Sequence, residues 1–408
     1  MLLPTPATGP DAAVEWVRTH LGDLCCDEPT ASPAFRGGQQ AADTALATLD
    51  LAGYAARRNE VLPRSRRGAT RLSPFIRYGL IDLPTAWAAA SGAPPRDRTK
   101  FRDELQWQEY ARHLYARLGH RMATALRAAP ARPARSWDEP WPATMNCVAT
   151  TVEELETDGW LVNQTRMWMS SQWTVRAGAE WTAGEDRFFT HLLDGSRAAN
   201  RLGWQWTIGA GTGKPYGFSR WQVQKRAPQL CRDCALSDDC PIQDWPDDPP
   251  PGGSPPGSPL LRGDPDPEAT GGPREPQRHG EPGAVWLTAE SLGDADPALS
   301  AHPGLPVVFV FDEPLLARLN LAGKRLVFLA ETLADLARRR DVEVRRGRVR
   351  EELAGRAVAV THAPVPGFRT RSAAVGPVEV HPWPWLHRPH AGPAGSYSAW
   401  RNALRARA

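Results

Sequence analysis

The chain has 408 residues, of which 41% are hydrophobic and 23% charged, and its formal net charge is +3. This composition is typical of a globular protein of two or three domains. It excludes a disulfide scaffold, since there are only six cysteines, and a membrane span, since charge or proline interrupts every long apolar run. The first residues lack a basic segment followed by an apolar one, so we expect no secretory signal and a cytoplasmic location.

The first 245 residues predict an all-helical part. Apolar residues recur there at helical spacing, and strand-like runs are nearly absent. The stretch 57–135 is basic, with 17 Lys and Arg against 6 Asp and Glu. Such a stretch can bind a polyanion, although an Arg-rich, solvated helical surface would show the same excess of basic residues. The helical spacing is carried by Phe101, Leu105, Leu114 and Leu118, by Val152, Leu155 and Leu161, and by Phe188, Phe189, Leu192 and Leu193.

Tryptophan is concentrated in this helical part, which holds ten of the 17 between residues 107 and 221. Each one taken alone is best explained by core packing. Taken together they favour two further interpretations, stacking surfaces for nucleobases or a redox relay beside a cofactor. The ten are Trp107, Trp137, Trp141, Trp160, Trp168, Trp173, Trp181, Trp204, Trp206 and Trp221.

Three cysteines near the end of the helical part predict a metal site. Cys231, Cys234 and Cys240 lie within ten residues, and Pro241 follows the last one. Thiolates this close together can share one soft metal centre, and the order of preference is an iron–sulfur cluster, then zinc, then chance. Cys147 is the best single candidate for a fourth ligand, because the adjacent thiols of residues 25 and 26 cannot easily both point inward.

A Pro- and Gly-rich segment over residues 246–282 predicts a disordered linker, since it holds 12 Pro and 7 Gly among 37 residues. After it the pattern changes to short β-rich runs at 284–287, 306–312, 342–346, 357–362 and 378–381, with an amphipathic helix over 324–340. Strands that alternate with helices favour a doubly wound parallel sheet. The predicted organisation is therefore a helical part (1–245), a linker (246–282) and an α/β part (283–408).

Five motifs in order resemble those of the photolyase/cryptochrome family. They are Gly37-Gly38-Gln39-Gln40-Ala41 with Tyr54-Ala55-Ala56-Arg57-Arg58-Asn59; Ala69-Thr70-Arg71-Leu72-Ser73-Pro74; Glu104-Leu105-Gln106-Trp107-Gln108-Glu109-Tyr110; Asp158-Gly159-Trp160-Leu161-Val162-Asn163-Gln164-Thr165-Arg166-Met167; and Asp194-Gly195-Ser196 continuing to Trp204-Gln205-Trp206. Family members begin with an α/β antenna domain and end with a helical FAD domain. The order here is reversed, so the chain resembles a circularly permuted member, and permutation leaves each core intact.

The resemblance implies FAD in the helical part, with Asn200 facing the flavin N5 and the cofactor supplying the redox chemistry. It also implies a [4Fe–4S] cluster held by Cys147, Cys231, Cys234 and Cys240, as in one branch of the family, which favours the cluster over zinc. No antenna chromophore can be assigned. The residues implied to hold FAD are Tyr54, Thr70, Arg71, Leu72, Ser73, Phe101, Gln108, Trp160, Asn163, Arg166, Asp194, Ser196 and Asn200.

The resemblance further implies light-driven repair of cyclobutane pyrimidine dimers in UV-damaged DNA by a monomeric lyase that flips the lesion out of the duplex. Val162 and Asn163 stand where enzymes for the 6-4 lesion carry His, which disfavours that lesion. A cryptochrome-like photoreceptor and a degenerate member without flavin are the alternatives. The lesion residues would be Glu104, Trp107, Asn163, Met167 and Trp206, and Trp204 and Trp181 would begin an electron relay whose third member is Trp137, Trp141, Trp168 or Trp173.

Overall fold

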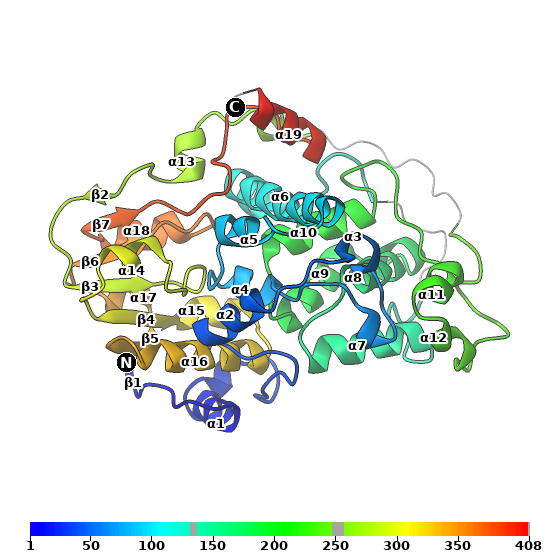
Figure 1. Ribbon diagram of the computed structural model, residues 1–408, viewed down its shortest axis with the longest axis horizontal. Helices are drawn as coiled ribbons and strands as arrows, with labels where there is room; N and C mark the ends of the chain where they lie inside the picture. Colours follow the sequence, from blue (N-terminus) through cyan, green and yellow to red (C-terminus); the bar gives the residue numbers. More distant parts are fainter. Residues whose placement is uncertain (131–136, 247–256, 407–408) are drawn as a thin grey trace.

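The computed structural model describes residues 1–130, 137–246 and 257–406. Helices make up most of the chain before residue 245, and the chain after residue 283 supplies five strands of a seven-stranded sheet with helices between them (Figure 1). The expected mixture of helices and a parallel sheet is therefore confirmed. Within the described ranges, no helix is long and apolar enough to cross a membrane.

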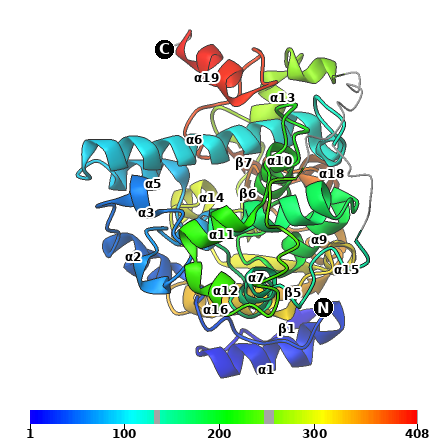
Figure 2. The same cartoon turned by 90° about the vertical axis from the view of Figure 1, so that its right-hand side faces the viewer.

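The helical part is built around one long helix, α6 (Pro95–Leu118), which runs across the upper half of the molecule, below α13 and α19 (Figure 2). Pro94 and Pro95 start this helix, since proline is tolerated in a first turn, and Gly119 ends it at φ 58°. The other helices are α1 (Pro10–Leu21), α2 (Gln39–Ala47), α3 (Tyr54–Arg57), α4 (Ser73–Arg77), α5 (Leu83–Ala89), α7 (Asn146–Thr157), α8 (Asn163–Ser170), α9 (Trp181–His191), α10 (Arg197–Thr207), α11 (Arg220–Arg226) and α12 (Pro228–Arg232), with a π-helical turn at Ser171–Arg176.

The centre of the sheet consists of five parallel strands in the order β5-β4-β3-β6-β7. All five strands predicted from the sequence are present, and their order is that of a doubly wound fold. Two short antiparallel strands, β1 (Leu2–Leu3) beside β5 and β2 (Gln277–Arg278) beside β7, complete the edges. The parallel strands are β3 (Ala284–Leu287), β4 (Val307–Asp312), β5 (Val342–Gly347), β6 (Val358–Thr361) and β7 (Glu379–His381).

Helices cover both faces of the sheet, as a buried parallel sheet requires. Side chains alternate between the two faces: Val285 and Leu287 of β3 pack into one apolar core, and Trp286 packs into the other. The first face carries α1, α14 (Pro297–Ala301), α15 (Glu313–Leu319) and α16 (Gly323–Ala337), and the second carries α17 (Val349–Glu352) and α18 (Phe368–Val375).

Helix α16 joins the sheet to the helical part. Phe328 stacks on Tyr78 with 5.1 Å between ring centroids, so one apolar core runs through both parts. Arg325 is fully buried and donates to the carbonyl oxygens of Phe189 and Gly195, the latter at 2.9 Å. A guanidinium buried in this way is stabilised by the carbonyl groups it bonds. The turn at Gly195 is thereby held against α16.

The N-terminal residues lie on the α/β part. Strand β1 pairs with β5, and α1 packs against α16 through Trp16 and Val17. Trp16 also donates through Nε1 to the carbonyl oxygen of Pro4 at 2.9 Å. The expected boundary after residue 245 therefore does not separate the two packing units, because the first 21 residues belong with the sheet.

Residues 257–282 are packed, which differs from the disordered linker expected over 246–282. Leu261 is buried against α6, and Asp264 forms an ion pair with the buried Arg117 at 3.2 Å. Arg117 also donates to the carbonyl oxygen of Leu260, so backbone groups of this Pro-rich segment are satisfied by one side chain of α6. Composition misses such a contact because it comes from far along the chain. The segment continues into α13 (Pro267–Gly271) and β2, while residues 247–256 lie outside the described ranges.

The segment after β7 is fastened to the outer face of α6. Glu109 is fully buried and accepts the backbone N–H of His387 at 2.9 Å. His113 accepts a hydrogen bond from Trp400 Nε1 at its Nδ1, which leaves its Nε2 to donate to the carbonyl oxygen of His387. The last helix, α19 (Tyr397–Arg405), packs on α6 beside these contacts.

Burial raises the pKa of Glu109 to about 7, which gives a testable pH dependence. In the folded protein Glu109 keeps its proton up to about pH 7, whereas in the unfolded chain it loses the proton near its ordinary pKa of 4.5. The free energy of unfolding therefore falls as pH rises from about 4.5 to about 7. Glu109→Gln removes this titration and keeps one acceptor oxygen. We expect the free energy of unfolding of the variant, relative to that of the parent, to rise by about 3 kcal/mol between pH 5 and pH 8. Urea unfolding across that range measures it, and a difference independent of pH would contradict it.

Candidate functional site

A cavity of about 270 Å³ lies in the helical part, between the inner face of α6 and the helices α8 and α10. It is lined by all thirteen residues that were implied to hold FAD and by four of the five implied to contact the lesion. Those residues are Tyr54, Thr70, Arg71, Leu72, Ser73, Phe101, Glu104, Trp107, Gln108, Trp160, Asn163, Arg166, Met167, Asp194, Ser196 and Asn200, Asn163 belonging to both sets.

Helical periodicity explains why these side chains meet. On α6 the cavity residues recur three or four positions apart, from Phe101 through Glu104 and Gln108 to Arg112. Residues at this spacing share one face of a helix. Asn163, Arg166, Met167 and Ser170 repeat the spacing on α8, and Asn200, Gly203, Trp204 and Thr207 repeat it on α10.

The cavity wall is cationic on balance, with five Arg against three acids. Arg166 donates to Asp194 Oδ2 at 2.7 Å, and Arg58 lies 3.2 Å from Glu104 Oε1. An excess of guanidinium groups suits an anionic ligand such as a diphosphate. The charged residues of the wall are Arg58, Arg71, Arg77, Arg112 and Arg166, with Glu104, Asp194 and Glu290.

Besides Arg77 Nη1, which forms an ion pair with Glu290, four buried polar atoms of the cavity residues have no hydrogen-bond partner in the described part of the chain. They are Asn59 Oδ1, Asp194 Oδ1, Asn200 Nδ2 and Trp204 Nε1. A buried polar group without a partner costs roughly 1–3 kcal/mol, so four in one wall point to a polar ligand. Two acceptors and two donors fit the mixed hydrogen-bonding edge of a flavin.

Arg71 holds one end of the cavity in an unusual conformation. Its φ of 59° lies in the left-handed region, which is uncommon for a residue with a side chain. The guanidinium packs over the rings of Phe35 and Trp160, at 4.7 Å and 5.7 Å from their centroids. Trp160 in turn donates through Nε1 to Ser73 Oγ at 3.0 Å. Arg71, Ser73 and Trp160, all predicted, thus form one connected wall.

The α/β part also reaches the cavity, which the sequence did not predict. Glu290 follows strand β3 and Val365 follows β6, and both line the cavity. These two strands lie side by side where the strand order reverses, the usual ligand crevice of a doubly wound sheet. Glu290 pairs with Arg77 at 2.9 Å, and burial lowers the pKa of the neighbouring Arg112. Glu290 and Val365 do not belong to any of the motifs found in the sequence. Only the contact between the α/β part and the helical part identifies them as cavity residues.

Trp206 does not line the cavity with the other lesion residues. It is 39% exposed, and its ring centroid lies 6.1 Å from that of Tyr216. Trp206 and Trp204 are two positions apart on α10, so they point to different sides of the helix. Trp204 faces the cavity and is 2% exposed.

A network of aromatic rings leads from Trp204 towards the surface. Trp204 contacts Phe188 (5.3 Å between centroids), Phe188 contacts Trp141 (5.7 Å) and Trp141 contacts the partly exposed Trp173 (4.7 Å). A β-carbon on Gly184 would lie 2.3 Å from Trp204 Cη2 and 2.9 Å from Trp173 Cγ, so these two indoles also approach across Gly184. Trp181, the predicted second member of the relay, is buried in the same core. Of the remaining candidates for the third member, Trp168 stacks on Phe218 and Trp137 packs at the edge of this core.

The four predicted cysteine ligands line one smaller cavity beside α7, α11 and α12. Burial raises the pKa of Cys147 to about 12, and the other three thiols add to the effect. Arg220 lines the same cavity, and its Nε is buried without a hydrogen-bond partner among the described residues. A guanidinium N–H beside four thiols fits a centre with anionic sulfur ligands.

Comparisons with known proteins agree with this site. Residues 101–227 match the family model described as the FAD binding domain of DNA photolyase. The chain is 29% identical over 206 residues to the deoxyribodipyrimidine photo-lyase of Synechococcus sp., covering 45% of this chain and 40% of that protein. It is 29% identical over 223 residues to a Thermus thermophilus enzyme of the same name, covering 51% and 50%. Residues 101–227 are thus similar to a photolyase FAD-binding domain, and about half of the chain is similar to curated photo-lyases.

Two solved structures show a partial likeness. One is a class III photolyase from Agrobacterium tumefaciens, with a TM-score of 0.41, 24% identity and coverage of 48% of this chain and 44% of that one. The other is a Synechocystis sp. cryptochrome, with a TM-score of 0.43, 20% identity and coverage of 49% and 45%. The chain spans about half the length, or less, of the curated relatives it matches.

Proposed function

We propose that this chain is a light-driven DNA repair enzyme that splits cyclobutane pyrimidine dimers with reduced FAD and also holds a [4Fe–4S] cluster. The convergence of the implied flavin residues and four implied lesion residues on one cavity carries the proposal. When bound, reduced FAD would supply the electron that opens the dimer ring. The reversed order of the helical and α/β parts supports a circular permutation of the family architecture.

The residues of the cavity divide into two sets. Arg71 and Ser73, with Thr70, would hold the diphosphate and ribityl region, where a guanidinium and hydroxyl groups supply charge and donors. Asn200 and Asp194 would contact the flavin ring through the atoms that now lack partners. The buried pair of Arg166 with Asp194 orients that carboxylate.

Glu104 and Trp107 would receive the flipped-out dimer. Glu104 lies at the cavity between Arg58 and Lys100, the latter at 2.8 Å, so its carboxyl group is held in place to bond a base edge. Trp107 would stack on the dimer, a contact worth roughly 1–3 kcal/mol per base. Trp206, exposed outside the cavity, would meet DNA beside the extruded nucleotides.

The proposed electron relay begins at Trp204 and ends at Trp173. Trp204 touches the cavity and Trp173 reaches the solvent, with Trp141 and Phe188 between them. This route favours Trp173 over Trp137 and Trp168 as the exit. Trp181, buried in the same core as Trp204, is kept in the proposal as the second member of the relay.

The experiment that tests repair uses the purified full chain, chemically reduced, with an oligonucleotide that carries one cyclobutane dimer. Under blue light we expect dimer loss, which chromatography measures, and none in the dark. Glu104→Gln should lower repair about 10- to 100-fold, the worth of one charge-assisted hydrogen bond. Trp221→Phe is the control, because Trp221 is exposed and lies outside the cavity.

Two results would contradict the proposal. Dimers that persist under light with fully reduced flavin would favour a photoreceptor. Repair of an oligonucleotide with a 6-4 lesion, but not of one with a dimer, would reverse the assignment of the lesion.

A further inference from the structure

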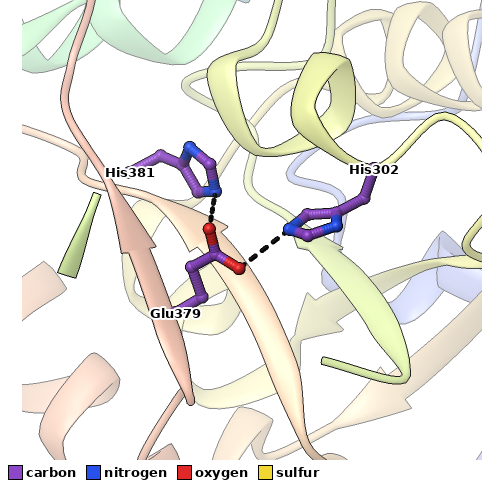
Figure 3. Close-up of side chains that lie close together, drawn as sticks. All are labelled: His302, Glu379 and His381. Carbon is purple, nitrogen blue, oxygen red and sulfur yellow. Dashed lines mark hydrogen bonds and ion pairs between the residues drawn. The ribbon is translucent and has the colours of Figure 1, made fainter. Parts of the chain in front are cut away.

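Two histidines and a glutamate meet in the α/β part, in a cluster that the proposed repair function does not use. His302 Nε2 lies 2.9 Å from Glu379 Oε2, and His381 Nε2 lies 2.9 Å from Glu379 Oε1 (Figure 3). The ligand atoms of all three residues lie within 4.8 Å of one another. Glu379 and His381 are 1% and 3% exposed, and the side chain of His302 is 20% exposed.

The fold brings these residues together in two steps. Glu379 and His381 are two positions apart on strand β7, so they point to the same face of the sheet. Helix α14 packs against β6 and β7, and His302 follows its last residue. A strand and a helix end separated by more than seventy residues are thereby held at one point.

We propose that His302, Glu379 and His381 bind a divalent first-row transition-metal ion, with Zn²⁺ as the best fit. Two imidazole nitrogens and a carboxylate oxygen are a common protein donor set for such ions, and Zn²⁺ accepts three protein ligands with an open fourth position. The partial exposure of His302 leaves a path for the ion and for a water ligand.

The position of His381 supports this assignment. Its Nε2 is buried and lies 2.9 Å from Glu379 Oε1, in an ion-pair contact that is not aligned as a hydrogen bond. A cation between the imidazole nitrogen and the carboxylate would give both groups a partner.

Arg278 is the one competitor that the structure provides within its described ranges. It lies opposite Glu379 in the pairing of β2 with β7 and donates through Nε to Oε1 at 2.8 Å. Its side chain is 65% exposed, so it can turn into solvent when an ion binds. Buried Asp296, which accepts a hydrogen bond from Ser291, is a further carboxyl group close enough to interact with His381. If the cluster served only as an ion pair, Arg278 would be essential to it, whereas a metal site works better without Arg278.

An ion at this point would act as a clamp. It would hold the end of α14 against β7, the last parallel strand of the sheet. A ligand that binds only the folded state raises its stability, so the clamp is detectable without any assay of activity.

The test is Zn²⁺ binding by the full-length protein after chelator treatment, measured by metal analysis and by thermal unfolding. We expect His302→Ala to bind one Zn²⁺ fewer than the parent, or to bind it more than 10-fold more weakly, since even an outer partner of a ligand contributes 10- to 100-fold. Zn²⁺ should raise the melting temperature of the parent more than that of this variant. Zinc bound at the cysteine site is common to both proteins and cancels in the comparison.

Two further variants complete the design. His279→Ala changes an exposed histidine next to β2 and should bind Zn²⁺ like the parent. Arg278→Ala removes the competitor and should bind Zn²⁺ more tightly than the parent. The proposal is overturned if His302→Ala and the parent bind the same amount of Zn²⁺ with the same affinity, or if Arg278→Ala loses the ion as His302→Ala does.

Discussion

Trp204→Phe is expected to abolish light-driven reduction of the flavin while leaving the flavin bound. Trp204 lines the cavity and contacts the rings that lead through Phe188 to Trp141 and Trp173, and its Nε1 is buried without a partner in the described chain. Phenylalanine fills much of the same space but is far harder to oxidise. Absorption spectra recorded during blue illumination with an external electron donor measure the rate.

The control for this variant is Trp168→Phe. Trp168 is fully buried in the same core, where it stacks on Phe218, and it does not line the cavity. Trp173→Phe should slow photoreduction, because it changes the proposed exit. Trp204→Phe should still repair dimers once its flavin is reduced chemically, which separates the relay from the repair step. Photoreduction of Trp204→Phe at the rate of the parent would remove Trp204 from the relay.

Cys231→Ser is expected to remove iron from the protein and to destabilise the region around α11 and α12. The cavity that holds the four cysteines joins these helices to α7, and the thiols would otherwise face each other without a bridging centre. Loss of a structural metal centre costs the folding energy that it supplies, on the order of several kcal/mol. Iron analysis, visible absorption and thermal unfolding measure the effect.

Cys25→Ser is the matched control for the cluster, because Cys25 is a partly buried thiol elsewhere in the chain. It should keep iron and stability. Parent protein that contains one zinc per chain and no iron would decide for the zinc alternative, and loss of iron from both variants would contradict the ligand assignment.

Much of the site follows from local sequence. Phe101, Glu104 and Gln108 meet because helical spacing puts them on one face of α6, and the five strands follow from short apolar runs between turns. Glu290 and Arg77 could not be found in this way. They are 213 residues apart and come together only when the sheet docks on the helices. The cluster of His302, Glu379 and His381 was not predicted either, because its residues also lie far apart in the sequence and meet only when α14 packs against β7.

The Pro-rich segment shows a second limit of composition. Twelve prolines predict disorder, yet Arg117 on α6 bonds to the backbone of Leu260 and pairs with Asp264. A single buried guanidinium supplies partners that the segment lacks by itself. Whether a polar, Pro-rich segment packs thus depends on the surface it meets, which its own residues do not encode.

The pairing of β1 with β5 has a consequence for biosynthesis. Strand β1 is translated well before its partner strand, which begins at Val342, and α1 is translated before α16. At a translation rate of about 5–20 residues per second, β1 and α1 spend tens of seconds without these partners, with their apolar side chains uncovered. During that time Trp16 and Val17 are exposed to other nascent chains and to chaperones. A protein cut into a helical half and an α/β half would keep that exposure permanently, so the two halves are best produced together.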